Sequence, residues 1–292
     1  MEKTNILGVK IDCLTLDQVL EKTDSLLLTD HQSQITNHKS PIIVTANPEI
    51  VLTARKYTNY REILNNADLV VADGGGLLWA GEYLNTTGCP FNCPVCSFFK
   101  SVFRFLFRQN DLKTIPQKIT GVDLMVDICK QAVKNNKSVY FFGGRDNVAR
   151  QCYEVLKKQL PNLLVAGVMD APEVTVTKDE NNLKINCPEI EIVLAKINET
   201  KPDILFVALG APKQELFLSE YLSRIPTIKI AMGVGGAFDF WAGRAKRAPQ
   251  GFKNFHLEWL WRLFREPWRL KRIFNATVSF VYFIVKYRIL NR

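Results

Sequence analysis

Short apolar runs alternate with longer amphipathic segments along most of the chain. Runs of β-branched and aliphatic residues bounded by glycine or polar residues predict buried strands, and apolar residues that recur with a helical period predict helices. The predicted strands cover residues 41–45, 68–72, 138–142, 163–168, 203–209 and 227–232. The predicted helices cover residues 16–27, 49–55, 121–134, 147–160, 189–199 and 212–221, and Thr15 is the expected N-cap of the first.

This alternation predicts the fold class. Strands that alternate with helices of about ten residues or more indicate βαβ units and a parallel sheet. We therefore expect an α/β core over residues 1–243, a Rossmann-like parallel sheet flanked by helices, with an insertion at about 84–118. After residue 243 the pattern changes to mixed aromatic and basic residues, so residues 244–292 are predicted to form a basic helical C-terminal appendage.

The stretch Asp68–Trp79 carries the most informative pattern. Its apolar run stops at Asp73 and three glycines and then resumes with helical spacing, which predicts a strand, a tight turn and a helix. Asp73 would then lie at the carboxyl end of a strand, the edge at which open α/β sheets bind ligands. An aspartate there fits two roles, a general base or a cap of the following helix, and this stretch alone leaves both open.

Other predicted strands also end in polar or glycine-rich loops. Thr45-Ala46-Asn47 follows one strand, Gly143-Gly144 another, and the loops 210–215 and 233–239 follow two more. Glycines let the backbone approach a ligand closely, and amides at a following helix N-terminus favour phosphate. Several such loops on one edge suggest a nucleotide or diphosphate, although glycine after a strand more often marks only a turn. The G-x-G-x-x-G and G-x-x-x-x-G-K-[ST] signatures are absent from the sequence.

The positive charge is concentrated at the C-terminal end. The chain has 38 Lys and Arg against 29 Asp and Glu, a net charge of +9, and residues 244–292 hold twelve of the basic and two of the acidic residues. The sequence contains no Asp-x-Asp pair, which many sugar transferases use to hold a divalent metal. The charge of a bound diphosphate would then have to be met by Arg, Lys and backbone N–H groups, which the appendage could supply.

The cysteines and the apolar runs bear on the compartment. Seven mostly scattered cysteines and an N-terminal stretch without a secretory signal predict a reducing, cytoplasmic location. The longest apolar run, residues 273–285, falls short of the roughly 20 residues that span a bilayer. We expect it to lie on a membrane or to pack on a partner.

Seven blocks of sequence carry more specific motifs. They are VTANPEIVLTAR (44–55), ADLVVADGGGLLWA (67–80), ITGVDLM (119–125), VYFFGG (139–144), DILFVALGAPKQE (203–215), GVGGAFDFWAGRAKRAP (233–249) and LEWLWRLFREPWRLKR (257–272). In this order they resemble the TagA/WecG/CpsF family of bacterial glycosyltransferases. The resemblance covers most of the chain, and GAPKQE and the last block are its most specific parts.

The resemblance implies an inverting, metal-independent enzyme without cofactors. It would move N-acetylmannosamine, its uronic derivative or a related hexose from UDP to a polyprenyl-diphosphate-linked sugar, in cell-surface polysaccharide or teichoic acid linkage synthesis. Asp73 matches the family's proposed general base, which takes a proton from the acceptor hydroxyl. Thr45 and Gln214 match residues that orient the substrates, and Asn47 lies beside Thr45.

Glycine loops and one acid are expected to hold the nucleotide. The glycines are Gly143, Gly144, Gly235 and Gly236, and Asp239 is the expected ribose partner. Their positions after predicted strands allow close approach of the backbone to a ligand.

Basic residues are expected to hold the diphosphate. Arg262, Arg269 and Arg272 match arginines that reach the active site of the family, and their spacings of seven and three let them share one helical face. The alternative is a solvated or lipid-facing charge stripe. Lys118 departs from the family, which usually has Arg there, so the charge is kept and the bidentate fork is lost.

The insertion is the second departure, because it is longer than the family leads us to expect. It contains Cys89-x-x-x-Cys93-x-x-Cys96, a spacing found in radical-SAM iron–sulfur enzymes and compatible with zinc. A small structural metal site or no metal at all is the preferred interpretation, because nothing else in the chain indicates a radical-SAM barrel.

A basic aromatic helix is predicted within the insertion, over residues 97–109. It places Lys100, Arg104 and Arg108 at successive i+4 positions among aromatic and aliphatic residues. Such a helix suits a lipid headgroup interface, and packing on the domain with a solvated basic edge is an equal alternative.

The implied partners are a UDP-sugar, a polyprenyl-diphosphate-linked acceptor and the inner face of the cell membrane, to which the protein would attach peripherally. Aromatic residues interleaved with the C-terminal arginines could stack nucleic-acid bases, but a lipid-linked acceptor favours a membrane surface, so no nucleic acid is expected. Two other interpretations stay open: a dehydrogenase or methyltransferase of similar fold, and a peripheral membrane module without catalysis. The sequence leaves open the identity of both sugars and whether the chain forms a homo-oligomer.

Overall fold

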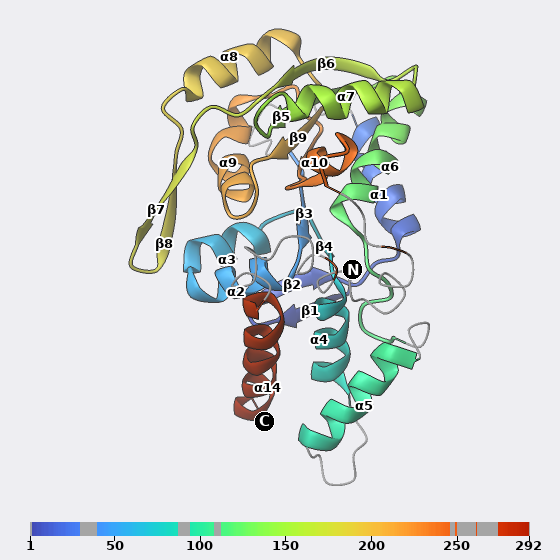
Figure 1. Cartoon of the computed structure of the whole chain (residues 1–292), viewed down its shortest axis with the longest axis vertical. Helices are drawn as coiled ribbons and strands as arrows, with labels where there is room; N and C mark the ends of the chain where they lie inside the picture. The colour runs from blue at the N-terminus through green and yellow to red at the C-terminus, as the bar shows by residue number, and fades with distance from the viewer. Residues whose placement is uncertain are drawn as a thin grey trace.

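A six-stranded parallel sheet lies at the centre of the computed structural model, which describes residues 2–29, 40–86, 94–107, 112–245, 249, 261 and 274–291. The strand order is β4-β3-β10-β9-β5-β6 (Figure 1). The strands are β3 (Ile42–Ala46), β4 (Leu69–Ala72), β5 (Ser138–Gly143), β6 (Leu164–Met169), β9 (Ile204–Ala208) and β10 (Ile230–Gly233). The predicted α/β class with a parallel sheet is confirmed.

Helices cover both faces of this sheet. One apolar layer contains α2 (Pro48–Lys56), α3 (Thr58–Asn65), α4 (Gly75–Asn85), α8 (Ile190–Thr200) and α9 (Lys213–Tyr221). The other contains α1 (Leu16–Leu28), α6 (Gly121–Lys134), α7 (Val148–Gln159) and α10 (Ala237–Trp241). Successive strand residues alternate between the layers, with Val44 in the first and Ile43 in the second. Burial on both faces explains why these strands are continuous apolar runs in the sequence.

Local signals set several element boundaries. Thr15 caps α1 as predicted: its hydroxyl accepts from the Gln18 N–H at 3.3 Å, and the Gln18 side chain accepts from the Thr15 N–H at 2.9 Å. The sequence pattern missed the hairpins β1 (Lys3–Ile6) with β2 (Val9–Asp12) and β7 (Thr175–Asp179) with β8 (Asn182–Asn186), and the helix α3. These elements are short and interrupted by polar residues, so none presents the long periodic pattern that identifies an element.

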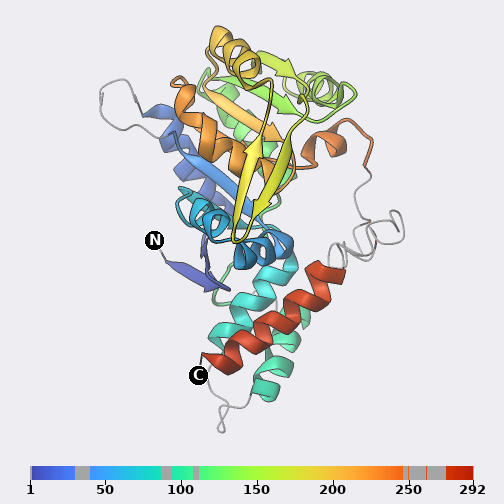
Figure 2. The same cartoon turned by 90° about the vertical axis from the view of Figure 1, so that its left-hand side faces the viewer.

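The insertion and the C-terminal end form a helical layer beside the β4 edge of the sheet. The predicted basic aromatic helix is present as α5 (Pro94–Phe107), which packs on α4. At the C-terminal end, the short π-helix η5 (Asn275–Ser279) continues into α14 (Phe280–Leu290). A short 3-10 helix, η3 (Leu222–Arg224), follows α9 in the core. Helix α14 contacts α2, α4 and α5, at the end of the molecule opposite α8 (Figures 1 and 2). Among the helices that the structure describes, none is long and apolar enough to cross a bilayer.

Candidate active site

Asp73 follows β4 directly, at the carboxyl edge of the sheet. Its N–H donates to the Ala46 carbonyl at 2.6 Å, and its carboxylate Oδ2 accepts from the Gly121 N–H at 3.1 Å. Gly74, with φ of 120°, is the N-cap residue of α4 and makes no side-chain cap, so the interpretation of Asp73 as a cap of that helix is wrong. Gly121 is the first residue of α6, and the positive end of a helix stabilises an ionised carboxylate.

Thr45 lies beside the same glycine. It is buried near the end of β3, and a Cβ placed on Gly121 would lie 2.9 Å from its hydroxyl oxygen. Only glycine therefore lets α6 begin this close to β3, and the approach brings Thr45 and Asp73 together around one backbone N–H group. Lys118 lies next to this group, because the N–H of the following residue, Ile119, donates to the Ala72 carbonyl at 2.9 Å.

Asn47 has a structural task in this arrangement. Its side-chain oxygen accepts from the Ile50 N–H at 3.0 Å, which makes it the N-cap of α2. Pro48 follows as the first helical residue, a position that proline favours. The expected help of Asn47 in orienting substrate stays a prediction, and any such contact would come from a side chain already tied to α2.

Gln214 is buried at the start of α9, and both ends of its amide have protein partners. Its oxygen accepts from the Gly235 N–H at 2.9 Å, and its nitrogen donates to Glu215 Oε1 at 2.8 Å. The other oxygen of Glu215 accepts from the Tyr60 hydroxyl at 3.0 Å. Gln214 thus positions the loop after β10, and its predicted contact with substrate is not tested by these bonds.

Glu215 is a buried carboxyl group that the sequence pattern did not single out, although it ends the GAPKQE motif. Burial raises its pKa, and the hydrogen bonds from Gln214 and Tyr60 oppose that shift in part. Burial and the adjacent Glu215 also raise the pKa of Tyr60 well above its ordinary value. The three side chains form one buried hydrogen-bonded chain that ends at the Gly235 backbone.

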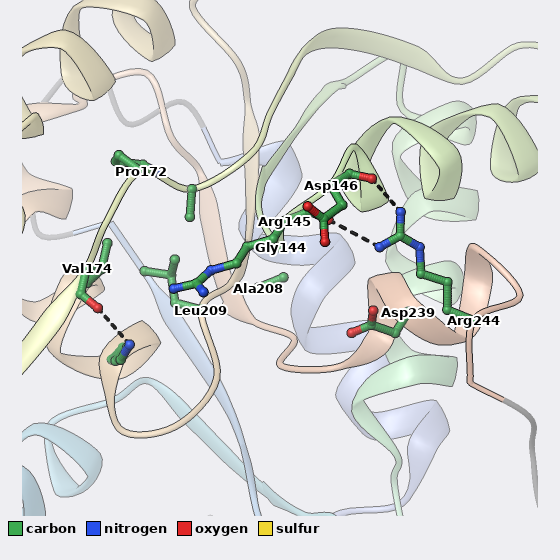
Figure 3. A pocket seen from close by; sticks show the side chains of 11 residues that line it. Gly144, Arg145, Asp146, Pro172, Val174, Ala208, Leu209, Asp239 and Arg244 are labelled. Atoms are coloured by element: carbon green, nitrogen blue, oxygen red, sulfur yellow. Dashed lines mark hydrogen bonds between the residues drawn. The ribbon is translucent and has the colours of Figure 1, made fainter.

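A cavity of about 380 Å³ opens at the carboxyl ends of β5 and β9 (Figure 3). The chain leaves β5 through α7 toward β6, and it leaves the neighbouring β9 through α9 toward β10, so the connections run in opposite directions. Such a point of reversal is where open α/β sheets bind their ligands. The residues lining the cavity are Gly144, Arg145, Asp146, Ala171, Pro172, Val174, Ala208, Leu209, Lys213, Asp239 and Arg244.

Three cationic side chains, those of Arg145, Lys213 and Arg244, border this cavity. Lys213 donates to the Val174 carbonyl at 2.6 Å, which ties α9 to the β7 hairpin. Arg244 donates to Gln151 at 3.0 Å and to the carbonyls of Arg145 and Asp146. The Arg145 side chain extends across the cavity toward Leu209 (Figure 3). The sequence pattern placed Lys213 in a candidate ligand loop and Arg244 in the basic appendage, but it missed Arg145, which directly follows the Gly143-Gly144 turn.

Of the predicted nucleotide contacts, Gly144 and Asp239 line the cavity. Gly143 and Gly144 have φ angles of 121° and 75°, and a Cβ would lie 2.6 Å from the Ala208 carbonyl oxygen and 2.0 Å from Val148, respectively. Glycine is therefore required at both positions. Gly235 donates its N–H to Gln214, and Gly236 is the N-cap residue of α10. Contact of these two glycines with a nucleotide stays a prediction.

The cysteines close to the site do not act as nucleophiles. Burial, with a smaller contribution from the Asp239 carboxylate, raises the pKa of Cys152 to about 12. A thiol with so high a pKa stays protonated and unreactive near neutral pH. Cys96 is free and exposed on α5, whereas Cys89 and Cys93 lie outside the described residues. Within the described part of the chain, no cluster of three His, Cys, Asp or Glu side chains could hold a metal ion.

The three C-terminal arginines, Arg262, Arg269 and Arg272, also lie outside the described residues. The described chain on either side of them lies at the site. Arg244 lines the cavity, and the Phe280 ring would lie 3.8 Å from a Cβ placed on Gly76, in the first turn of α4.

The chain is similar to known sugar transferases over nearly its whole length. A model described as the glycosyl transferase WecG/TagA/CpsF family matches residues 4–114 and 111–292. An N-acetylglucosaminyldiphosphoundecaprenol N-acetyl-beta-D-mannosaminyltransferase of Bacillus spizizenii is 30% identical over 260 residues, which are 89% of this chain and 85% of that protein. A protein of the same name from Staphylococcus aureus strain MRSA252 is 30% identical over 287 residues, 97% of this chain and 92% of the relative. The chain therefore belongs to the WecG/TagA/CpsF family of glycosyl transferases, as its sequence blocks predict.

Proposed function

We propose that this protein transfers N-acetylmannosamine, or a closely related hexose, from a UDP-sugar to N-acetylglucosamine linked through diphosphate to a polyprenol. The two relatives are named for N-acetylmannosamine transfer to N-acetylglucosaminyldiphosphoundecaprenol. Family membership favours this activity over the dehydrogenase and methyltransferase alternatives.

The observation that carries the proposal is the arrangement of one carboxylate and one cation-bordered cavity along a single sheet edge. Asp73 follows β4, and the cavity lies between β9 and β5, three to four strands away. With about 4.8 Å between neighbouring strands, the separation is about 14–19 Å. An extended nucleoside diphosphate sugar spans such a distance, so a nucleotide bound in the cavity can direct its sugar toward Asp73.

The reaction then needs one base and one stabilised leaving group. The Asp73 carboxylate accepts the proton of the acceptor hydroxyl while that oxygen attacks the anomeric carbon of the donor sugar. The bond between the anomeric carbon and the diphosphate oxygen breaks, and UDP leaves with the electron pair. Attack opposite the leaving group inverts the anomeric configuration. The Gly121 N–H, which donates to Asp73 Oδ2 at 3.1 Å, fixes the orientation of this carboxylate.

Cationic side chains would balance the diphosphate without a metal. Arg145, Lys213 and Arg244 border the cavity, and guanidinium groups bind phosphate through paired N–H donors. We assign Arg262, Arg269 and Arg272 the same task, because their sequence block resembles the one that supplies diphosphate-binding arginines in this family. Lys118, beside the Asp73 loop, would add a further positive charge.

The lipid carrier of the acceptor places the reaction at a membrane. We propose that the C-terminal segment attaches the protein peripherally to the inner face of the cell membrane, because residues 244–292 carry twelve basic and two acidic residues together with many aromatic ones. Basic and aromatic side chains together favour the headgroup region of an anionic bilayer.

A donor panel tests the function directly. UDP-N-acetylmannosamine and UDP-N-acetylglucosamine are offered with a short-chain N-acetylglucosamine diphosphate lipid in the presence of EDTA, and products are analysed by mass. We expect one added N-acetylhexosamine from the first donor, unchanged by EDTA. If UDP stabilises the protein but neither donor gives a product, the non-catalytic membrane module is favoured. Product that requires added metal would contradict the metal-independent mechanism.

A further inference from the structure

Exposed apolar side chains are concentrated on two helices that lie beside each other. Of the ten exposed large apolar side chains among the described residues, seven belong to α5 or to the segment 274–291. These two segments make up a small part of the described chain, and neither contains an acidic residue. Scattered exposed apolar residues are normal, but a concentration of this kind marks an interaction surface.

On α5 the exposed residues form one stripe. Among the α5 residues whose burial the structure describes, 96–105, the exposed ones are Cys96, Phe99, Lys100 and Phe103. Spacings of three and four residues place them on one face of the helix. Phe99 is 67% exposed and Phe103 is 55% exposed. A pair of outward phenyl rings beside a lysine is an amphipathic pattern turned toward solvent.

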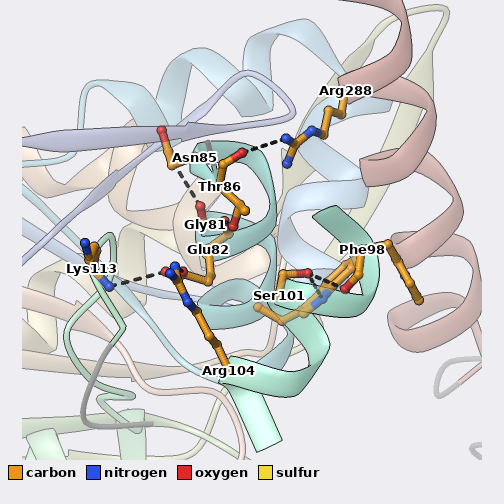
Figure 4. A network of polar contacts seen from close by, with 10 residues as sticks. Gly81, Glu82, Asn85, Thr86, Phe98, Ser101, Arg104, Lys113 and Arg288 are labelled. Carbon is orange, nitrogen blue, oxygen red and sulfur yellow. Dashed lines mark hydrogen bonds and ion pairs between the residues drawn. The ribbon is translucent and has the colours of Figure 1, made fainter. Parts of the chain in front are cut away.

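Buried polar contacts hold α5 in this orientation. The Trp79 indole N–H donates to the Ser101 hydroxyl at 3.1 Å, and Arg104 forms an ion pair with the buried Glu82 carboxylate (Figure 4). Glu82 also accepts from the Lys113 N–H at 3.3 Å. Arg104 thus turns inward, which corrects the expectation that Lys100, Arg104 and Arg108 form one outward basic stripe; Arg108 lies outside the described residues.

A buried arginine joins α5 to the C-terminal helix. Arg288 of α14 donates to the Thr86 carbonyl at 2.7 Å and to the Ser97 hydroxyl at 3.0 Å, and its guanidinium lies 4.6 Å from the centre of the Tyr83 ring. This places the ends of α4, α5 and α14 in one junction (Figure 4). On the segment leading into and along α14, the exposed residues recur about every four positions and are Phe274, Val278, Tyr282, Lys286, Ile289 and Leu290.

We propose that α5 is a second membrane-docking element, which inserts Phe99 and Phe103 into the headgroup region of an anionic bilayer. The occupant is a lipid surface because the exposed stripe pairs phenyl rings with Lys100 on a helix without acidic residues. Such a helix gains apolar burial and attraction to anionic lipids together. The inference extends the proposed attachment from the C-terminal segment to the insertion.

Docking through α5 would fix the distance from the bilayer to the reacting hydroxyl. The helix packs on α4, which begins two residues after Asp73 and contains 11 residues. At 1.5 Å per residue, α4 is about 16 Å long, so the docked surface and the base are joined by one short helix. The diphosphate-linked sugar of a lipid-anchored acceptor would then reach Asp73 at a constant distance from the bilayer surface.

Vesicle sedimentation tests the proposal on the full-length chain. The double variant Phe99→Asn/Phe103→Asn is compared with the double variant Leu164→Asn/Ile192→Asn. The control removes two apolar residues, 45% and 52% exposed, from β6 and α8 at the far end. We expect the α5 variant to bind vesicles of phosphatidylglycerol and phosphatidylcholine about tenfold more weakly. The control variant should bind like the unchanged protein. Matching thermal melts of both variants would show that the fold is intact.

The outcomes separate this inference from the proposed function. Loss of vesicle binding in the α5 variant supports lipid docking even if no sugar transfer is found with any donor. Unchanged vesicle binding in the α5 variant overturns the proposal, whatever the transfer activity. A shift from dimer to monomer in light scattering, with unchanged vesicle affinity, would also overturn it and identify a second copy of the chain as the occupant.

Discussion

The two ends of the sheet edge that carries the candidate site are built in different ways. At the β5 and β9 end, backbone turns, glycines with positive φ and three cations border a polar cavity. At the β4 end, Asp73 and Thr45 meet at the first turn of α6, and a layer of helices with outward aromatic side chains lies beside them. The first end suits a charged, water-soluble ligand, and the second suits a ligand that arrives from a membrane.

Under the proposed function, this difference places the two substrates at opposite ends of the edge. A nucleotide diphosphate carries most of its charge at the cavity, where Arg145 and Lys213 lie. A lipid-linked acceptor carries most of its apolar surface on its polyprenyl chain, which is compatible with the helical layer and its outward aromatic side chains. The reacting atoms would then meet at the β4 end, near the Asp73 carboxylate. Variants at each end should therefore alter different measured quantities.

The largest effect is expected from Asp73→Asn. Removal of the general base should lower kcat about 10³-fold, equivalent to about 4 kcal/mol in the barrier, because the acceptor proton then has no carboxylate to accept it. Affinity for UDP, measured by calorimetry, should be unchanged. Asp239→Asn is the matched control at the cavity end, where we expect a higher KM for the UDP-sugar and nearly unchanged kcat. Equal kcat values for Asp73→Asn and the unchanged enzyme would remove Asp73 from the role of base.

The next largest effect concerns stability at the helical end. Arg104→Ala leaves the buried Glu82 carboxylate without its ion pair and should lower the free energy of unfolding by about 3 kcal/mol in urea titrations. Arg150→Ala breaks a pair with Glu154 in which both side chains are mostly exposed, and it should cost less than about 0.5 kcal/mol. Similar losses for both variants would show that the Arg104 pair is no stronger than a surface pair.

A smaller effect is expected at the cavity. Arg145→Ala removes a cation that extends across the cavity proposed to hold the nucleotide. It should raise KM for the UDP-sugar about tenfold, as expected for one lost hydrogen bond to a charged group. Vesicle binding should stay unchanged. Arg224→Ala, on the surface beside Glu191, is the control and should leave KM unaltered. An unchanged KM in Arg145→Ala would place the diphosphate elsewhere.

The smallest expected effect is a pH dependence of stability that comes from Glu215, on α9. The pKa of Glu215 is raised by burial, so its contribution to stability is greatest below the ordinary carboxyl value of 4.5 and is lost as pH rises through the higher folded-state value. Glu215→Gln does not titrate and keeps one acceptor for Tyr60. The stability of the native protein relative to this variant should therefore fall in urea titrations as pH rises above 4.5. A relative stability that rises over this range would contradict the raised pKa.

The sequence by itself determined the α/β class and the family. Apolar strands buried on both faces stand out as continuous runs, and the glycines at 143 and 144 are readable because only glycine tolerates their backbone angles and contacts. The amphipathic helix in the insertion was also predictable from its period. Such features depend on neighbours within a few residues, so the linear pattern records them.

Tertiary structure alone decided which polar groups act together. The sequence left two roles open for Asp73. In the structure its carboxylate accepts from the Gly121 N–H, 48 residues away, and Gly74 is the N-cap residue of the helix that follows. Arg104 was expected outside and pairs with Glu82 inside, and Glu215 joins Tyr60, 155 residues earlier in the chain. The energy of a buried charge or hydrogen bond depends on partners brought close by the fold, and the spacing of residues along the chain does not specify those partners.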